Sequence, residues 1–290
     1  MCDDDIHPGL IVDPTLSRRG FGLMAAAAAG LAGNAAHAAA AAAVVETDVD
    51  IKTADGTADA ALYYPQGKGP WPAVLIWPDV VSLRPAFREM GRRLASAGYV
   101  VLVPNFYYRA KRAPVVESGF NYGVPEDRAK LTALRVTLTP EGTARDAVAF
   151  QAFLDAQPQT AVKKKAGVQG YCMGGPMAFR TAGAAPGRIG AVASFHGGGL
   201  ITDAPDSPHL LLPRTKAEYL ICVADNDDQK DPANKDKIKA ALDAAGLKSK
   251  VEVYAGAAHG WTVKGSEVYN EAAAEKAWTE LLALYKRALV

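Results

Sequence analysis

The segment Val168-Gln169-Gly170-Tyr171-Cys172-Met173-Gly174-Gly175 decides how the rest of the chain is interpreted. It has the form Gly-x-Cys-x-Gly, follows an apolar run and leads directly into a helical pattern. This combination is typical of a nucleophile elbow, a sharp strand-to-helix turn that exposes one reactive side chain at its tip. The positive end of the helix dipole there favours the thiolate form of Cys172. The alternative is a small buried cysteine in a glycine-rich turn.

Apolar runs alternate with helical patterns on both sides of this turn, after an antiparallel start in which Asp55-Gly56 predicts a tight hairpin within residues 45–65. Strands that are apolar on both faces, separated by amphipathic helices, predict a mostly parallel sheet covered by helices on both sides. The irregular stretch 109–140 is expected to be a loop or a small lid. The further strands are expected at 72–77, 99–104, 166–171, 189–195, 218–223 and 250–254, and the helices at 85–97, 141–156 and from near Met173, Pro232 and Ser266.

Composition narrows the classes of function. A chain of 290 residues that is 49% hydrophobic favours one catalytic domain, and its net charge of +1 gives no reason to expect nucleic acid or an anionic membrane as a partner. The three cysteines, Cys2, Cys172 and Cys222, are too few and too irregularly spaced for a disulfide framework, and none forms a Cys-x-x-Cys pair for zinc. The cysteine pattern therefore favours a role for a single reactive thiol.

The N-terminal segment resembles a twin-arginine export signal. Ser17-Arg18-Arg19-Gly20-Phe21-Gly22-Leu23 precedes an alanine-rich run, and Ala36-His37-Ala38 fits the small-residue rule for cleavage. We therefore expect residues 1–43 to be an export signal and linker, read by the twin-arginine export machinery, and residues 44–290 to be the catalytic domain, located in the periplasm. The run is too weakly apolar for a stable membrane anchor. The alternative is an uncleaved extension on a cytoplasmic protein.

A hydrolase built on such an elbow needs an acid and then a histidine later in the chain. One apolar run ends in Asp225-Asn226-Asp227-Asp228, and another leads to His259. The residues alone do not select among the three aspartates, whose alternative role is a solvated loop or a helix cap. His196 also follows an apolar run, but it precedes the acidic cluster and breaks the expected order, so a structural or pocket-lining role is favoured for it. The sequence predicts His259 as the base.

Several blocks, in this order, resemble the dienelactone hydrolase family over nearly the whole chain after the export segment. The resemblance implies an α/β-hydrolase fold without metal or organic cofactor, and a triad of Cys172, His259 and Asp227. It also implies an oxyanion hole made by the backbone N–H groups of Met173 and Val80. The blocks are Trp77-Pro78-Asp79, Leu83-Arg84-Pro85, Gly98-Tyr99, Pro104-Asn105-Phe106-Tyr107-Tyr108-Arg109, Gly170-Tyr171-Cys172-Met173-Gly174-Gly175, Ala224-Asp225-Asn226-Asp227 and His259-Gly260-Trp261.

Two positions depart from the family's best-known members, in which a glutamate helps to activate the cysteine and two arginines hold a substrate carboxylate. Here Asp79 replaces the glutamate, Arg109 matches one arginine, and Val263 stands at the other position. The expected substrate contacts are Asp79, Arg109 and Trp261, with Trp261 and the aromatic residues 106–108 forming an apolar pocket.

The expected activity is cleavage of a small-molecule ester or lactone through a thioester intermediate on the cysteine. Two alternatives remain open. The first is a thiol-based redox enzyme, because an exposed thiolate is oxidisable. The second is a non-catalytic binding protein on the same fold.

Overall fold

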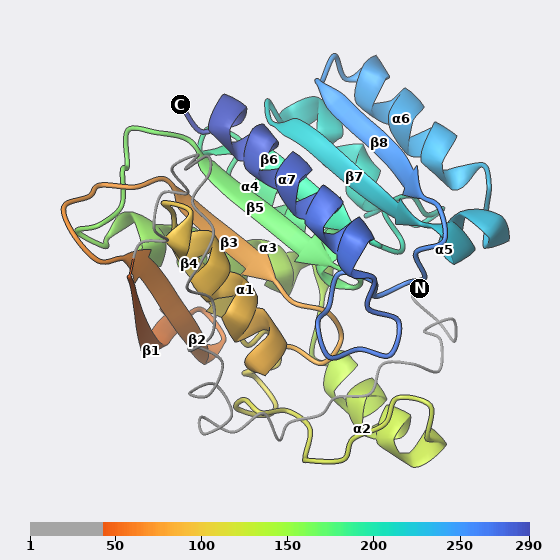
Figure 1. The fold of residues 1–290 in the computed structure, drawn as a ribbon, viewed down its shortest axis with the longest axis horizontal. Coiled ribbons are helices and arrows are strands. Elements are labelled where there is room, and N and C mark those ends of the chain that lie inside the picture. Colours follow the sequence, from red (N-terminus) through yellow and green to blue (C-terminus); the bar gives the residue numbers. More distant parts are fainter. Residues whose placement is uncertain (1–42) are drawn as a thin grey trace, which may run out of the picture.

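An eight-stranded sheet runs through residues 43–290, the part of the chain that this computed structural model describes (Figure 1). Its strand order is β1-β2-β4-β3-β5-β6-β7-β8; β1 pairs with β2 and β2 with β4 in antiparallel fashion, and the remaining pairs are parallel. The predicted mostly parallel sheet is confirmed. The strands are β1 (Val44–Thr53), β2 (Gly56–Pro65), β3 (Ala73–Trp77), β4 (Val100–Pro104), β5 (Ala166–Tyr171), β6 (Ile189–Phe195), β7 (Glu218–Ala224) and β8 (Ser249–Tyr254).

Helices cover both faces of the sheet, as Figure 1 shows. On one face α1 (Pro85–Ser96) and α7 (Glu271–Ala288) enclose a core with Phe87, Tyr171 and Phe195. On the other face α3 (Pro140–Asp155), α4 (Gly174–Ala184) and α6 (Asn234–Ala244) enclose a second core. The central strands β3, β4, β5 and β6 are buried along their whole length, which explains why their sequences are apolar on both faces.

The ends of the helices follow their capping residues. Thr139 accepts a hydrogen bond from the Gly142 N–H at the start of α3, and Asn270 does the same for the Ala273 N–H at the start of α7. The helix expected from near Ser266 therefore begins only at Glu271, because Asn270 caps it and the residues before it form turns. The short helices α5 (Asp225–Lys230) and η2 (Pro208–Arg214) were not predicted.

The irregular stretch 109–140 contains a helix, α2 (Pro125–Arg135), that begins with a proline at its first turn. Figure 1 places α2 beyond the end of the sheet at which β3 and β5 terminate.

The hairpin predicted at Asp55-Gly56 is confirmed: Thr53 pairs with Gly56 across the turn. The proposed export signal, including Arg18, Arg19 and the cleavage triplet, lies outside the described residues.

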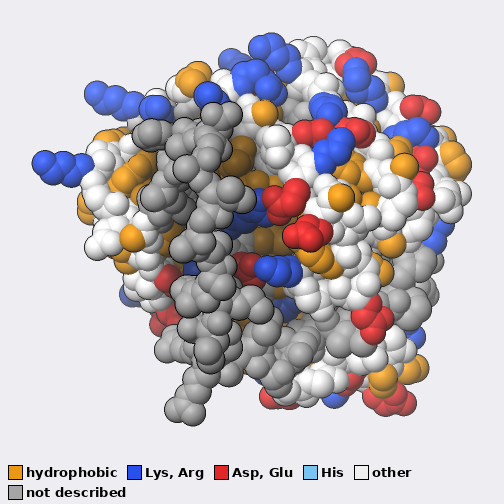
Figure 2. All heavy atoms as spheres, in the orientation of Figure 1, with side chains coloured by type: hydrophobic (Ala, Val, Ile, Leu, Met, Phe, Trp, Pro, Cys, Tyr) orange, Lys and Arg blue, Asp and Glu red, His pale blue; other side chains and the backbone are white. Residues whose placement is uncertain are grey.

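The surface of the described residues carries charges of both signs. Figure 2 shows lysine, arginine, aspartate and glutamate side chains interspersed over the face that includes α1 and α7. This agrees with the nearly balanced composition of 32 basic and 31 acidic residues. Among residues 43–290, no helix is both long and apolar enough to cross a bilayer.

Candidate active site

The turn after β5 is held in a strained conformation by close backbone contacts. Cys172 has a φ of +52°, a value that residues with a side chain rarely adopt. A Cβ on Gly170 would lie 1.9 Å from the carbonyl oxygen of Gly174, and a Cβ on Gly174 would lie 2.3 Å from that of Trp77. Only glycine fits these two positions, and the contact with Trp77 fixes the turn against the end of β3. The sequence motif therefore forms the predicted elbow.

The structure brings His259 and Asp227 to the same end of the sheet as Cys172. The Oδ2 atom of Asp227 lies 2.7 Å from Nδ1 of His259, and Asn226 Oδ1 accepts a 2.8 Å hydrogen bond from the His259 backbone N–H. The other two aspartates of the cluster have different partners: Asp225 accepts from the Gly256 N–H, and Asp228 pairs with Lys235. This geometry separates Asp227 from its neighbours, which the residue pattern alone could not do.

The charge of the His259 imidazole depends on these neighbours. Burial opposes its protonation, but the charge interactions with Cys172 and Asp227 and the hydrogen bond to Asp227 outweigh burial and raise the pKa of His259 to about 10. Its Nε2 atom has no partner in hydrogen-bonding geometry among the described residues. Cys172 and His259 are thus electrostatically coupled, in the loose alignment common to hydrolase sites without substrate.

A second histidine, His196, packs directly against the first. The two rings have centroids 4.8 Å apart, and the Nε2 atom of His196 lies 2.9 Å from the Thr262 hydroxyl. Burial, followed by the charge of His259, holds the pKa of His196 well below its ordinary value, so this ring is neutral. His196 also has a φ of +42° directly after β6. It lines the cavity described next, which is the role that the chain order favoured for it.

A cavity of about 330 Å³ opens beside Cys172, His196 and His259. Its wall comes from the loop after β6, from β7 and from the region of α5 and α6. Sequence reasoning missed this wall, although three consecutive glycines after a strand, 197–199, are a signal for a loop that lets a ligand approach its backbone. The remaining lining side chains used below are Leu200, Ile201, Ile221, Val223 and Ile238, with Asp227, Lys230 and Asp231.

Two backbone N–H groups belong to the elbow and to the loop that packs against it. Met173 directly follows Cys172, and Val80 lies in the loop after β3, against which Gly174 packs. Neither N–H has a hydrogen-bond partner within residues 43–290. Unpaired backbone donors near a nucleophile are the groups that an oxyanion hole requires.

The carboxylate of Asp79 is engaged by Arg84. The two side chains are buried and form a bidentate pair, with distances of 2.6 Å and 2.7 Å, and Asp79 also accepts from the Val81 N–H. These bonds hold the loop that contains Val80. The geometry therefore does not support the expected contact of Asp79 with substrate; its shorter side chain is used to shape the loop.

Replacing Asp79 with asparagine is expected to lower the free energy of unfolding by about 3 kcal/mol, because the buried Arg84 guanidinium loses its counter-charge. Urea denaturation would measure this loss. A matched control is Asp50→Asn, which breaks the exposed pair with Arg112 and should leave the free energy of unfolding close to that of the wild type. Equal stability of the two variants would contradict the structural role of Asp79.

Arg109 and Trp261 also lie apart from the cavity wall. The guanidinium of Arg109 donates four hydrogen bonds to Asp55 and Asp146, which leaves it committed to protein carboxylates. Trp261 is fully buried and stacks on Tyr254, with its edge toward His196. The expectation that these two residues contact substrate is not supported by this geometry. Trp261 instead supports the ring next to the candidate base.

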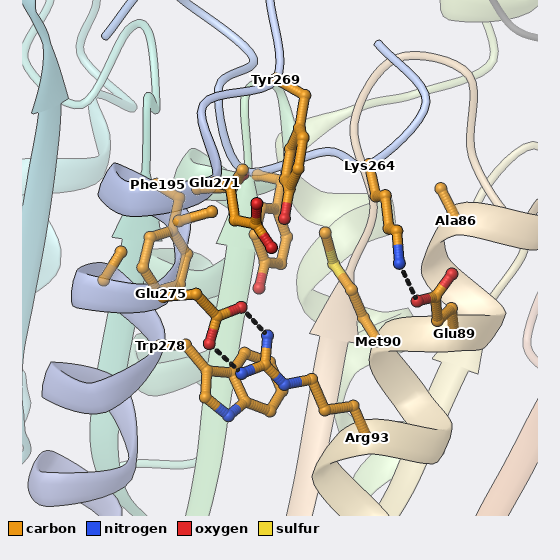
Figure 3. Close-up of a pocket in the computed structure, with 14 residues that line it drawn as sticks. Ala86, Glu89, Met90, Arg93, Phe195, Lys264, Tyr269, Glu271, Glu275 and Trp278 are labelled. Carbon is orange, nitrogen blue, oxygen red and sulfur yellow. Dashed lines mark hydrogen bonds and ion pairs between the residues drawn. The ribbon is translucent and has the colours of Figure 1, made fainter. Parts of the chain in front are cut away.

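A smaller hollow of about 120 Å³ lies between α1 and α7 (Figure 3). Four of its five charged residues are paired across it, Arg93 with Glu275 and Lys264 with Glu89; the fifth is Glu271. Arg93 also stacks over the Trp278 ring. The lining residues of the hollow include no cysteine, serine or histidine, whereas the cavity at Cys172 has a thiol beside two imidazoles.

Comparison with known proteins agrees with this site. The profile of the dienelactone hydrolase family matches residues 58–289. A Synechocystis protein provisionally named carboxymethylenebutenolidase is 26% identical over 228 residues, which cover 78% of this chain and 89% of the relative.

Solved structures share the fold. A provisionally assigned dienelactone hydrolase from Klebsiella pneumoniae superposes with a TM-score of 0.73 at 20% identity and covers 84% of this chain and 99% of that one. A dienelactone hydrolase-like promiscuous phosphotriesterase from metagenomic libraries gives 0.67 at 21% identity, covering 86% and 100%.

Proposed function

This chain is a hydrolase of the dienelactone hydrolase family, and on that premise we propose that it cleaves an ester or lactone with Cys172 as nucleophile, His259 as base and Asp227 as the acid that orients His259. The observation that carries the proposal is the convergence of these three side chains: the strained elbow places the buried Cys172 beside His259, whose Nδ1 is 2.7 Å from Asp227. Ester cleavage requires such a positioned nucleophile and proton carrier.

The reaction proceeds in two steps. The Cys172 thiolate attacks the carbonyl carbon, and the N–H groups of Met173 and Val80 stabilise the oxyanion. The carbon–oxygen bond then breaks, the alkoxide takes a proton from the His259 imidazolium, and a thioester remains on Cys172. In the second step water attacks the thioester and gives a proton to His259. The carbon–sulfur bond breaks, the carboxylic acid leaves, and the Cys172 thiolate is regenerated.

His196 and Asn226 support this cycle by position. Neutral His196 packs on His259 without adding a second positive charge, and Asn226 holds the His259 backbone. A thiol redox function is less well supported. The Cys222 thiol belongs to the core on the opposite face, where it bonds to Tyr254, so it is not placed to resolve an oxidised Cys172.

Trapping the intermediate tests the proposal. The protein is mixed with 4-nitrophenyl butyrate, quenched in acid within the first turnovers and analysed by intact mass and peptide mapping. We expect a butyryl adduct on Cys172 that decays as butyrate is released, because a thioester must precede hydrolysis. A butyryl adduct on another residue that forms and decays at the rate of turnover would refute the nucleophile.

We propose that the protein is exported through the twin-arginine route, because Arg18, Arg19 and the alanine-rich run that follows them resemble such a signal. The folded hydrolase would then act in the periplasm.

A further inference from the structure

The cavity beside Cys172 has a wall that is mostly aliphatic. Leu200, Ile221 and Ile238 are buried side chains that face it from the loop after β6, from β7 and from α6, and half-buried Ile201 and Val223 complete this part. Three glycines, 197–199, add backbone without side chains. Such a surface gains free energy by covering hydrocarbon and offers few partners to a charge.

Apart from His259, whose charge is compensated by Cys172 and Asp227, the charged residues of the wall do not favour an anion. Lys230 is the only lysine or arginine among the lining residues of the described chain; it and Asp231 are exposed at the rim, and a second acid, Asp227, is half-buried against His259. A carboxylate inside the cavity would therefore lose water without gaining an arginine partner. Burial without such a partner is costly for an ionised group.

The arginines that could approach from elsewhere are committed or distant. Arg84 is paired with Asp79, and Arg109 with Asp55 and Asp146. Val263 is buried in the core on the opposite face of the sheet. Arg135 of α2 acts electrostatically on the Tyr107 hydroxyl, but it is not part of the cavity wall.

We propose that this cavity binds the uncharged aliphatic part of an ester or lactone, and that it discriminates against substrates that carry a carboxylate on that part. The inference rests on the proposed function, since it concerns the substrate of the same cysteine. Its specificity-determining residues are Ile201, Ile221 and Ile238, which contact the hydrocarbon, whereas Lys230 at the rim does not set the preference.

A matched pair of substrates tests the charge discrimination. 4-Nitrophenyl hexanoate and mono-4-nitrophenyl adipate have the same leaving group and differ by a terminal methyl against a carboxylate. We expect kcat/KM to be at least about ten-fold higher for the hexanoate, since the unpaired carboxylate loses the hydrogen bonds that water gave it. The preference should persist in Lys230→Ala.

Three results have distinct meanings. If the adipate ester is cleaved as fast as the hexanoate or faster, the inference is wrong. If Arg135→Gln then removes that reactivity, the carboxylate is held from α2 instead. If the wild type cleaves neither ester, or if Cys172→Ala cleaves both as fast as the wild type, the proposed function is wrong. That conclusion does not depend on the ratio between the two esters.

A cavity-filling variant tests the location. Ile201→Trp should lower the ratio of kcat/KM for the hexanoate to kcat/KM for 4-nitrophenyl acetate by at least about ten-fold, because the larger side chain displaces the longer hydrocarbon chain more than the acetyl group. Leu247→Trp is the matched control: Leu247 is also half-buried but lies in the turn before β8, outside the cavity wall. Equal chain-length profiles for the two variants would place the hydrocarbon elsewhere.

Discussion

Cys172→Ala is expected to lower kcat/KM for 4-nitrophenyl butyrate by roughly 10,000-fold or more, because losing the nucleophile removes the covalent route altogether. The residual rate would come from the oxyanion donors and from binding. Initial rates with excess enzyme, corrected for spontaneous hydrolysis, would measure the loss. Folding should be retained, since the substitution removes one sulfur atom at the cavity wall.

Cys222→Ala provides the matched control for this variant. Both thiols are buried, but that of Cys222 bonds to Tyr254 on the other face of the sheet, and burial raises its pKa to about 12. We expect its activity to stay within about two-fold of the wild type. Activity of Cys172→Ala within about ten-fold of the wild type would mean that another group attacks the ester.

Gly170→Ala is expected to have the largest effect on stability, a loss of about 3 kcal/mol or more in the free energy of unfolding. The new Cβ would lie 1.9 Å from the Gly174 carbonyl oxygen, which is backbone and cannot rotate away. Relief requires the elbow to open, so the Cys172 side chain should also move and esterase activity should fall. Urea denaturation and activity assays on the same preparation would measure both effects.

Gly187→Ala is the matched control for this prediction. A Cβ added at Gly187 would meet no other atom within 4 Å, and the φ of this residue is not in the left-handed region. Its stability should stay within about 0.5 kcal/mol of the wild type. If Gly170→Ala were equally stable, the elbow would have to be far more pliable than its contacts indicate.

Much of the fold was predictable because its signals are local. The buried strands are apolar along their length, and the elbow glycines lie close together in the sequence, so both can be read without knowing the tertiary structure. The start of α7 was predicted near Ser266 and lies at Glu271. The helical pattern in the sequence continues across this boundary, so it did not reveal that Asn270 caps the helix.

The substrate contacts were less predictable because they depend on partners that are distant in the sequence. Arg109 is held by Asp55, which is 54 positions away, and by Asp146, which is 37 positions away. The cavity wall combines residues from β7, α6 and the loop after β6. Choosing Asp227 over Asp225 likewise required the resemblance to a family or the coordinates, since both acids follow the same strand.

Within the described chain three non-glycine residues have a positive φ, Ser82, Cys172 and His196, and they follow the neighbouring strands β3, β5 and β6. A left-handed conformation costs about 1 kcal/mol or more at each such residue. The edge of the sheet at which Cys172 lies therefore carries this backbone strain. A laboratory that evolved this protein for heat resistance alone would be expected to accumulate glycine at these positions, and to obtain a sturdier scaffold that no longer turns over esters.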